Sequence, residues 1–158
     1  MPTQRMTYSE NKGGNLVKVT VLITASGKIE AWSGISPGSE ADSTIWNSSS
    51  ILQNMVDNAE TVLPCILMMD KGYDSIRVPQ GTTALMPTKC GSAQFTLAEN
   101  EHTRLVASHR VTIECVFGVI KQQWSIFMDQ QPLSSFCNLE AMLFIVLCLY
   151  NMWNDHRK

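Results

Sequence analysis

Apolar and polar residues alternate over residues 16–24, with valine or isoleucine at every second position from Val17 to Ile23. A period of two with β-branched residues is typical of a strand that buries one face. The segment Ala25-Ser26-Gly27-Lys28 supplies a turn, and apolar residues return over 29–34. The pattern therefore predicts a β-hairpin near the start of the chain.

A helix is expected over residues 40–56, after the break at Ser36-Pro37-Gly38 and with Ser39 as its cap. Asp42 falls in the first turn of this helix, where a carboxylate complements the positive end of the helix dipole. We therefore interpret Asp42 as a structural residue rather than a catalytic one.

A continuous apolar run, Cys65–Met69, ends directly before Asp70. Runs of this length are typical of a strand that is buried on both faces. Ligand sites in open α/β sheets form at the carboxyl ends of such strands, so Asp70 is a candidate site residue by position. A weaker strand is expected over 83–86.

Thr96 and Glu99 have the spacing of a capping box, and the helical pattern that follows runs to about Trp124. One face of this helix is apolar, at Ile113, Val116, Phe117, Ile120 and Trp124. A second row lies beside it, made of Arg110, Glu114, Gly118 and Lys121. Glu114 is thus expected at the border between core and solvent, with space beside it at Gly118.

The last predicted helix, 138–154, is apolar on nearly all sides. Such a helix has to be buried in a core or in an interface, so we expect part of it to face a protein partner or a second copy of the chain. Its longest apolar stretch is too short to cross a bilayer, and we expect no membrane association.

Composition limits the possible classes of protein. A chain of 158 residues with 44% hydrophobic residues can bury one core, so one domain over 1–158 is expected. The net charge of −2 gives no global attraction to DNA, and any contact with nucleic acid has to rely on local basic residues. The five cysteines lack zinc-site spacing and are expected to be buried free thiols. No secretory signal is visible, so a nuclear or cytoplasmic location is expected.

Five short blocks occur in an order that resembles the DDE superfamily of transposase-derived nucleases, specifically its Harbinger-like branch. The blocks are Thr7-Tyr8-Ser9-x-x-Lys12, Leu16-Val17-Lys18-Val19, Pro37-Gly38-Ser39-x-x-Asp42-Ser43, Asp70-x-Gly72-Tyr73, and Thr103-Arg104-x-x-Ala107-Ser108-x-Arg110-x-x-x-Glu114 with Gly118-x-x-Lys121. Each block is short and degenerate, so the resemblance depends on their shared order.

The resemblance implies a ribonuclease H-like α/β fold, with a mixed sheet flanked by helices, and a DNA partner. It also implies cleavage of DNA phosphodiesters with Mg²⁺ or Mn²⁺, in which Asp70 is the second metal-binding acid and Glu114 the third. Arg110 would orient Glu114 or contact a phosphate, and Lys121 and Arg104 would contact backbone phosphates. Without the resemblance, Arg110 and Glu114 would be read as an ordinary i,i+4 ion pair.

The first acid of the family is expected on a strand shortly before the Tyr-Ser block, but no Asp or Glu precedes Glu10. We therefore expect a domain that lacks this strand, with two unpaired strand edges and low stability.

Three hypotheses follow. In the first, the chain is a metal-dependent nuclease domain that is inactive by itself. In the second, it is a non-catalytic binding or assembly module that retains the fold. In the third, it is a truncated product without a settled role. Cleavage by the chain would mean that Asp42 or Glu10 has taken the first position.

Overall fold

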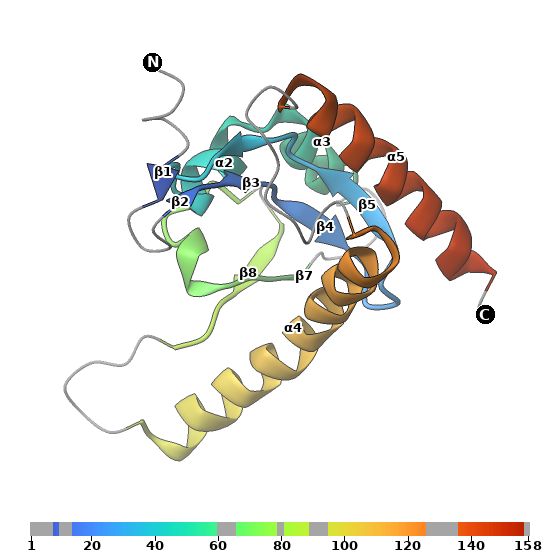
Figure 1. Ribbon diagram of the computed structural model, residues 1–158. Coiled ribbons are helices and arrows are strands. Elements are labelled where there is room, and N and C mark those ends of the chain that lie inside the picture. The colour runs from blue at the N-terminus through green and yellow to red at the C-terminus, as the bar shows by residue number, and fades with distance from the viewer. Residues whose placement is uncertain are drawn as a thin grey trace.

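The computed structural model describes residues 8–9, 14–59, 66–78, 81–88, 95–125 and 136–156 (Figure 1). The strands are β1 (Tyr8–Ser9), β2 (Gly14–Asn15), β3 (Val17–Lys18), β4 (Val21–Ile23), β5 (Ile29–Trp32), β6 (Ser36–Pro37), β7 (Ile66–Met68) and β8 (Thr83–Leu85). The helices are α2 (Asp42–Ser48), α3 (Ser50–Ala59), the 3-10 turn η2 (Lys71–Tyr73), α4 (Leu97–Gln123) and α5 (Phe136–Asp155). The predicted α/β class is confirmed.

The predicted hairpin is present as the antiparallel pair β4–β5. Gly27 in its turn has a φ of +80°, a conformation that glycine adopts without steric cost. The expectation of one strand over 16–24 was wrong. The segment contains two short strands, because β3 pairs with β6 while β4 pairs with β5.

The hairpin separates two apolar clusters. Val21 and Ile29 face one side, where they pack with buried residues of α4 and α5. Ala31 faces the other side and packs with Trp46 of α2, two residues of α3, and Leu67 and Met69 at β7. On β4 the sides alternate with the period of two that the sequence shows, since Val21 packs in the first cluster and Leu22 against the second. On β5, Ile29 and Ala31 are two residues apart yet face opposite sides, because the pairing register shifts between Leu22 and Ile23.

The predicted helix over 40–56 is two helices, and Ser39 does not cap it. α2 begins at Asp42 after Ala41, which makes no side-chain cap, and the chain becomes extended at Ser49 before α3. The residues at this break are Asn47, Ser48, Ser49 and Ser50. Such side chains compete with the helix for backbone hydrogen bonds, and the Ser49 hydroxyl accepts from the Leu52 N–H at 3.4 Å. The expected place of Asp42 in the first helical turn is confirmed.

β7 and β8 form a parallel pair, and Asp70 follows β7 as expected. The predicted burial of β7 on both faces was wrong for Ile66, which is 58% exposed. The described residues contain four two-stranded sheets, β4–β5 and β7–β8 among them, and the single mixed sheet stays a prediction.

The two long helices agree with the sequence pattern. Thr96 and Glu99 form the capping box of α4, which ends before Trp124. Val116 and Ile120 of its apolar face are buried. α5 buries Leu143, Val146, Leu147 and Tyr150. Over the part of the chain that is described, no helix has the length and apolar character needed to span a membrane.

Candidate functional site

Asp70 lies where the chain leaves β7 and enters η2. Its Oδ1 accepts a hydrogen bond of 2.7 Å from the Lys71 N–H, so the carboxylate caps this short turn. The cap holds the Asp70 side chain in one orientation at the end of the strand. Its second oxygen, Oδ2, is directed toward α4.

Arg110 of α4 connects Asp70 to Glu114. Its Nη2 donates a hydrogen bond to Asp70 Oδ2 at 3.2 Å, and the same nitrogen lies 3.7 Å from Glu114 Oε1. Two carboxylates from distant parts of the chain therefore surround one cationic atom. Their role as metal ligands stays a prediction.

The site is open to solvent. The side chains of Arg110, Asp70 and Glu114 are 30%, 51% and 64% exposed. Gly118, four residues after Glu114, has no atom within 4 Å of the position that a Cβ would take. The expectation that Gly118 leaves space beside the acid is confirmed.

The donor atoms fit a hard divalent cation. Mg²⁺ in proteins is commonly held by one or two carboxylates and keeps several water ligands. Asp70 Oδ2 and Glu114 Oε1 supply two such oxygens, and both already contact one positive group. Within the described ranges, no three His, Cys, Asp or Glu side chains are gathered in a way that could hold an ion. The arrangement is suited to a weakly held ion with two protein ligands.

Asp42 lies against the turn that carries Asp70. Its Oδ1 is 3.1 Å from Lys18 Nζ, which also donates to the Glu40 carbonyl at 2.8 Å. Its Oδ2 is so close to Gly72 that an added Cβ would lie 2.5 Å from it. Asp42 therefore joins β3, α2 and η2, which agrees with the structural interpretation made from the sequence. Glu10, the other acid considered for the first position, lies outside the described residues.

Tyr73 forms the apolar side of the same turn. The sequence predicted no role for it beyond its place in the block Asp70-x-Gly72-Tyr73. Its hydroxyl lies 3.1 Å from Thr20 Oγ1, and its ring meets Trp46 edge to face. Burial raises the pKa of the Tyr73 phenol, and Asp42 and Asp70 raise it further, against an opposing effect of the Thr20 hydrogen bond. The phenol is thus held neutral beside two carboxylates.

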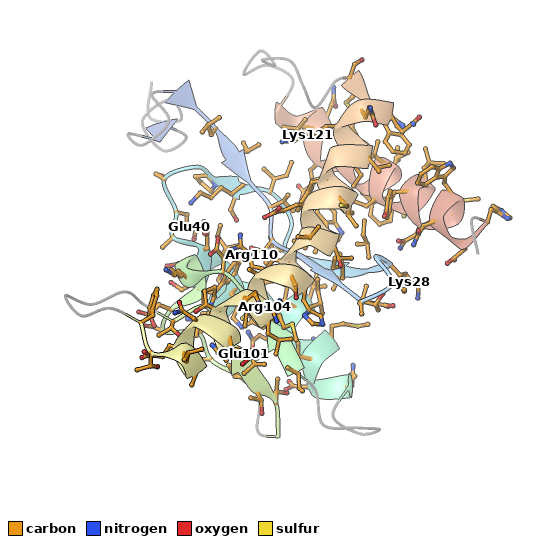
Figure 2. The ribbon with its side chains drawn as sticks, turned by 90° about the horizontal axis from the view of Figure 1, so that it is seen from below. Lys28, Glu40, Glu101, Arg104, Arg110 and Lys121 are labelled. Atoms are coloured by element: carbon orange, nitrogen blue, oxygen red, sulfur yellow. The ribbon has the colours of Figure 1, made fainter. Side chains whose placement is uncertain are left out.

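The other two basic residues expected at the site are not brought to the carboxylates. Figure 2 shows Arg104 and Arg110 on nearby turns of α4 and Lys121 toward the far end of that helix. Lys121 lies instead at a cavity of about 200 Å³ between β3, α4 and α5. The described ion pairs of Asp70 and Glu114 involve Arg110.

Two of the five cysteines can be assessed. Cys115 and Cys148 are free thiols, as expected, but both are exposed, so the predicted burial was wrong for them. Cys115 follows Glu114 on the solvent-facing side of α4, and Cys148 is on the exposed side of α5.

Comparison with protein families gives one finding. A family model described as DDE superfamily endonuclease matches residues 1–151, a span that includes both Asp70 and Glu114. Neither the curated proteins nor the solved structures give a significant match.

Proposed function

Because this chain belongs to the DDE superfamily endonuclease family, we propose that it is a transposase-derived domain that binds DNA and a divalent metal ion. Asp70 and Glu114 would hold Mg²⁺ or Mn²⁺. We further propose that these 158 residues do not cleave DNA by themselves. The observation that carries the proposal is the shared cationic contact of the two carboxylates at Arg110 Nη2.

Each residue has a distinct part in this proposal. The Lys71 N–H orients Asp70, so that Oδ2 is directed toward α4. Asp70 Oδ2 and Glu114 Oε1 are the proposed ligands. Arg110, which contacts both, is the proposed contact to a DNA phosphate. When bound, the ion would supply charge stabilisation and an activated water for phosphodiester hydrolysis. Arg104 and Lys121 are proposed contacts to the DNA backbone outside this centre.

The absence of cleavage follows from the number of ligands. In-line cleavage by two ions requires both the attacking and the leaving oxygen to be held by positioned metals. Two carboxylates with water can hold one ion weakly, but two ions share further ligands in such sites. A third acid would be required to complete a two-ion centre.

A ribonuclease H-like arrangement is also proposed. In the described part of the chain, β4 is paired with β5 and β7 with β8, so β4 and β7 each have one edge without a described partner. Leu22 of β4 packs on the same apolar cluster as Leu67 of β7. A further strand between β4 and β7 would unite the two pairs into one mixed sheet, with Asp70 at its carboxyl edge.

Metal binding and plasmid cleavage test the proposal. Calorimetric titration with Mn²⁺ should give weak binding that is lost in Asp70→Ala. Supercoiled plasmid incubated with the chain and Mn²⁺ should remain intact. Nicking that Glu114→Ala abolishes would contradict the proposed inactivity and assign the first acidic position to Asp42 or Glu10. Absence of any Mn²⁺ binding would contradict the metal site itself.

A second candidate function is assembly without catalysis, and the surface of α5 favours it. Phe144, Ile145, Leu149 and Met152 are between 44% and 61% exposed, although their helix is packed on the hairpin by the Trp32–Phe144 ring contact. A contiguous apolar surface of this kind is typical of an interface with a protein partner or a second copy. Sedimentation at increasing concentration should show self-association that Ile145→Glu removes. A monomer at all concentrations would leave a different protein as the partner for this surface.

A further inference from the structure

A single nitrogen of Arg110 contacts both proposed metal ligands. Nη2 lies 3.2 Å from Asp70 Oδ2 and 3.7 Å from Glu114 Oε1. Asp70 Oδ1 is already bonded to the Lys71 N–H, so Oδ2 is the oxygen that a shared cation would use. The guanidinium therefore stands between the two acids, at the position a shared cation would take.

We propose that Arg110 is an internal substitute for the metal ion, which leaves its position when a divalent cation binds Asp70 and Glu114. The inference rests on the proposed function, because it concerns the same two ligands. A guanidinium that stayed at its present position would repel a divalent ion at close range. It would also keep its hydrogen bond to Asp70 Oδ2 and occupy the space beside Glu114 Oε1 that the ion requires. Metal binding and release of Arg110 are then one event.

The released side chain gains a role in binding phosphate. Arg110 is 30% exposed at the border between the core and the solvent, so its guanidinium can move outward without crossing the apolar face of α4. Its planar set of donors suits a phosphate oxygen pair. A DNA phosphate that binds Arg110 would in turn vacate the position between the acids. Since such coupling is reciprocal, metal and DNA should each tighten the binding of the other.

A fixed positioning role for Arg110 predicts the opposite effect of mutation. If Arg110 only held Asp70 and Glu114 together, its removal would disperse the ligands and weaken metal binding. If it competes with the ion, its removal frees both oxygens and takes away a repelling charge. The two roles are therefore distinguished by the direction in which the metal affinity changes.

The experiment measures Mn²⁺ binding to the full chain by electron paramagnetic resonance of the free ion. Arg110→Gln should bind Mn²⁺ about two- to tenfold more tightly than the wild type, as expected from the loss of two exposed ion pairs. The matched control is Arg77→Gln, which removes an exposed arginine that has no part in the proposed site. Its Mn²⁺ affinity should equal that of the wild type.

Binding of a short DNA duplex gives a second measurement. Mn²⁺ should tighten duplex binding by the wild type, and this effect should be absent in Arg110→Gln. Circular dichroism checks that each variant is folded. Arg110→Lys provides a variant that keeps the charge and loses the planar donors, and its Mn²⁺ affinity should lie between those of the wild type and Arg110→Gln.

The outcomes distinguish the metal site itself from the role of Arg110 within it. Mn²⁺ affinity that falls or stays constant in Arg110→Gln, while Asp70→Ala abolishes binding, overturns the substitution role and leaves the metal site intact. Two results would overturn the proposed site together with this inference. One is Mn²⁺ binding that survives Asp70→Ala, and the other is the absence of Mn²⁺ binding in both the wild type and Arg110→Gln.

Discussion

Replacement of Gly72 by alanine probes how the turn that carries Asp70 is supported. The Cβ of Gly72→Ala would lie 2.5 Å from Asp42 Oδ2, whereas nonbonded heavy atoms pack best at about 3.5 Å. The carboxylate would have to withdraw by about 1 Å. It cannot do so freely, because Lys18 Nζ holds its other oxygen at 3.1 Å.

The expected cost is modest and has a defined origin. Overpacking typically destabilises by about 1–3 kcal/mol, and loss of an exposed ion pair by up to about 1 kcal/mol. We expect Gly72→Ala to lower the free energy of unfolding by about 1–2 kcal/mol. This value lies in the lower part of the range for overpacking, because the side chains of Lys18 and Asp42 are partly exposed. Gly72 is not among the glycines with positive φ, so its backbone adds no strain.

A double-mutant cycle with Asp42→Ala isolates the contact, with urea unfolding as the assay. In the Asp42→Ala background, Gly72→Ala should be neutral or stabilising, since alanine restricts the unfolded chain. The matched control is Gly118→Ala, where no neighbouring atom opposes the Cβ and the helix should gain about 0.5–1 kcal/mol. An equal cost of Gly72→Ala in both backgrounds would refute the assignment of the effect to Asp42.

Three further predictions concern stability. The raised pKa of Tyr73 means that the unfolded chain loses this proton first, so its contribution is complete below about pH 10 and declines as pH rises further. Tyr73→Phe should remove that decline in unfolding experiments; an unchanged alkaline slope would assign it to another group. Thr96→Ala removes the capping box with Glu99 and should cost about 1 kcal/mol in urea unfolding, and no loss would mean that the cap adds nothing to α4. Trp46→Ala at a site 1% exposed should lower stability by about 3–5 kcal/mol, and a loss below 1 kcal/mol would show that the cluster closes around the cavity.

The sequence pattern determined the elements that depend on neighbouring residues. The period of two placed the hairpin, and the capping box with one apolar face placed α4. Asp70 after an apolar run and Glu114 beside the apolar stripe of α4 were likewise identifiable as candidates. These features are local, because alternation, capping and helical spacing act over a few residues.

Tertiary structure decided how the distant parts meet. Trp46 of α2 and Leu52 of α3 are buried in one cluster with Ala31 of β5 and Leu67 of β7, residues that are distant in the chain. The separation of the strands into pairs depends on partners that are far apart in the chain. Ile66, Cys115 and Cys148 are exposed because no other described element covers their faces, which the local pattern could not predict.

The contact between Arg110 and Asp70 shows the same limit within the site. The sequence indicates an i,i+4 pair of Arg110 with Glu114, but the hydrogen bond of Arg110 reaches Asp70, 40 residues away. That contact requires α4 to lie against β7, as it does, and Val106, four residues before Arg110, is fully buried. The residue types were therefore readable from the chain, whereas their meeting around one cation was decided by the packing of α4 against the strands.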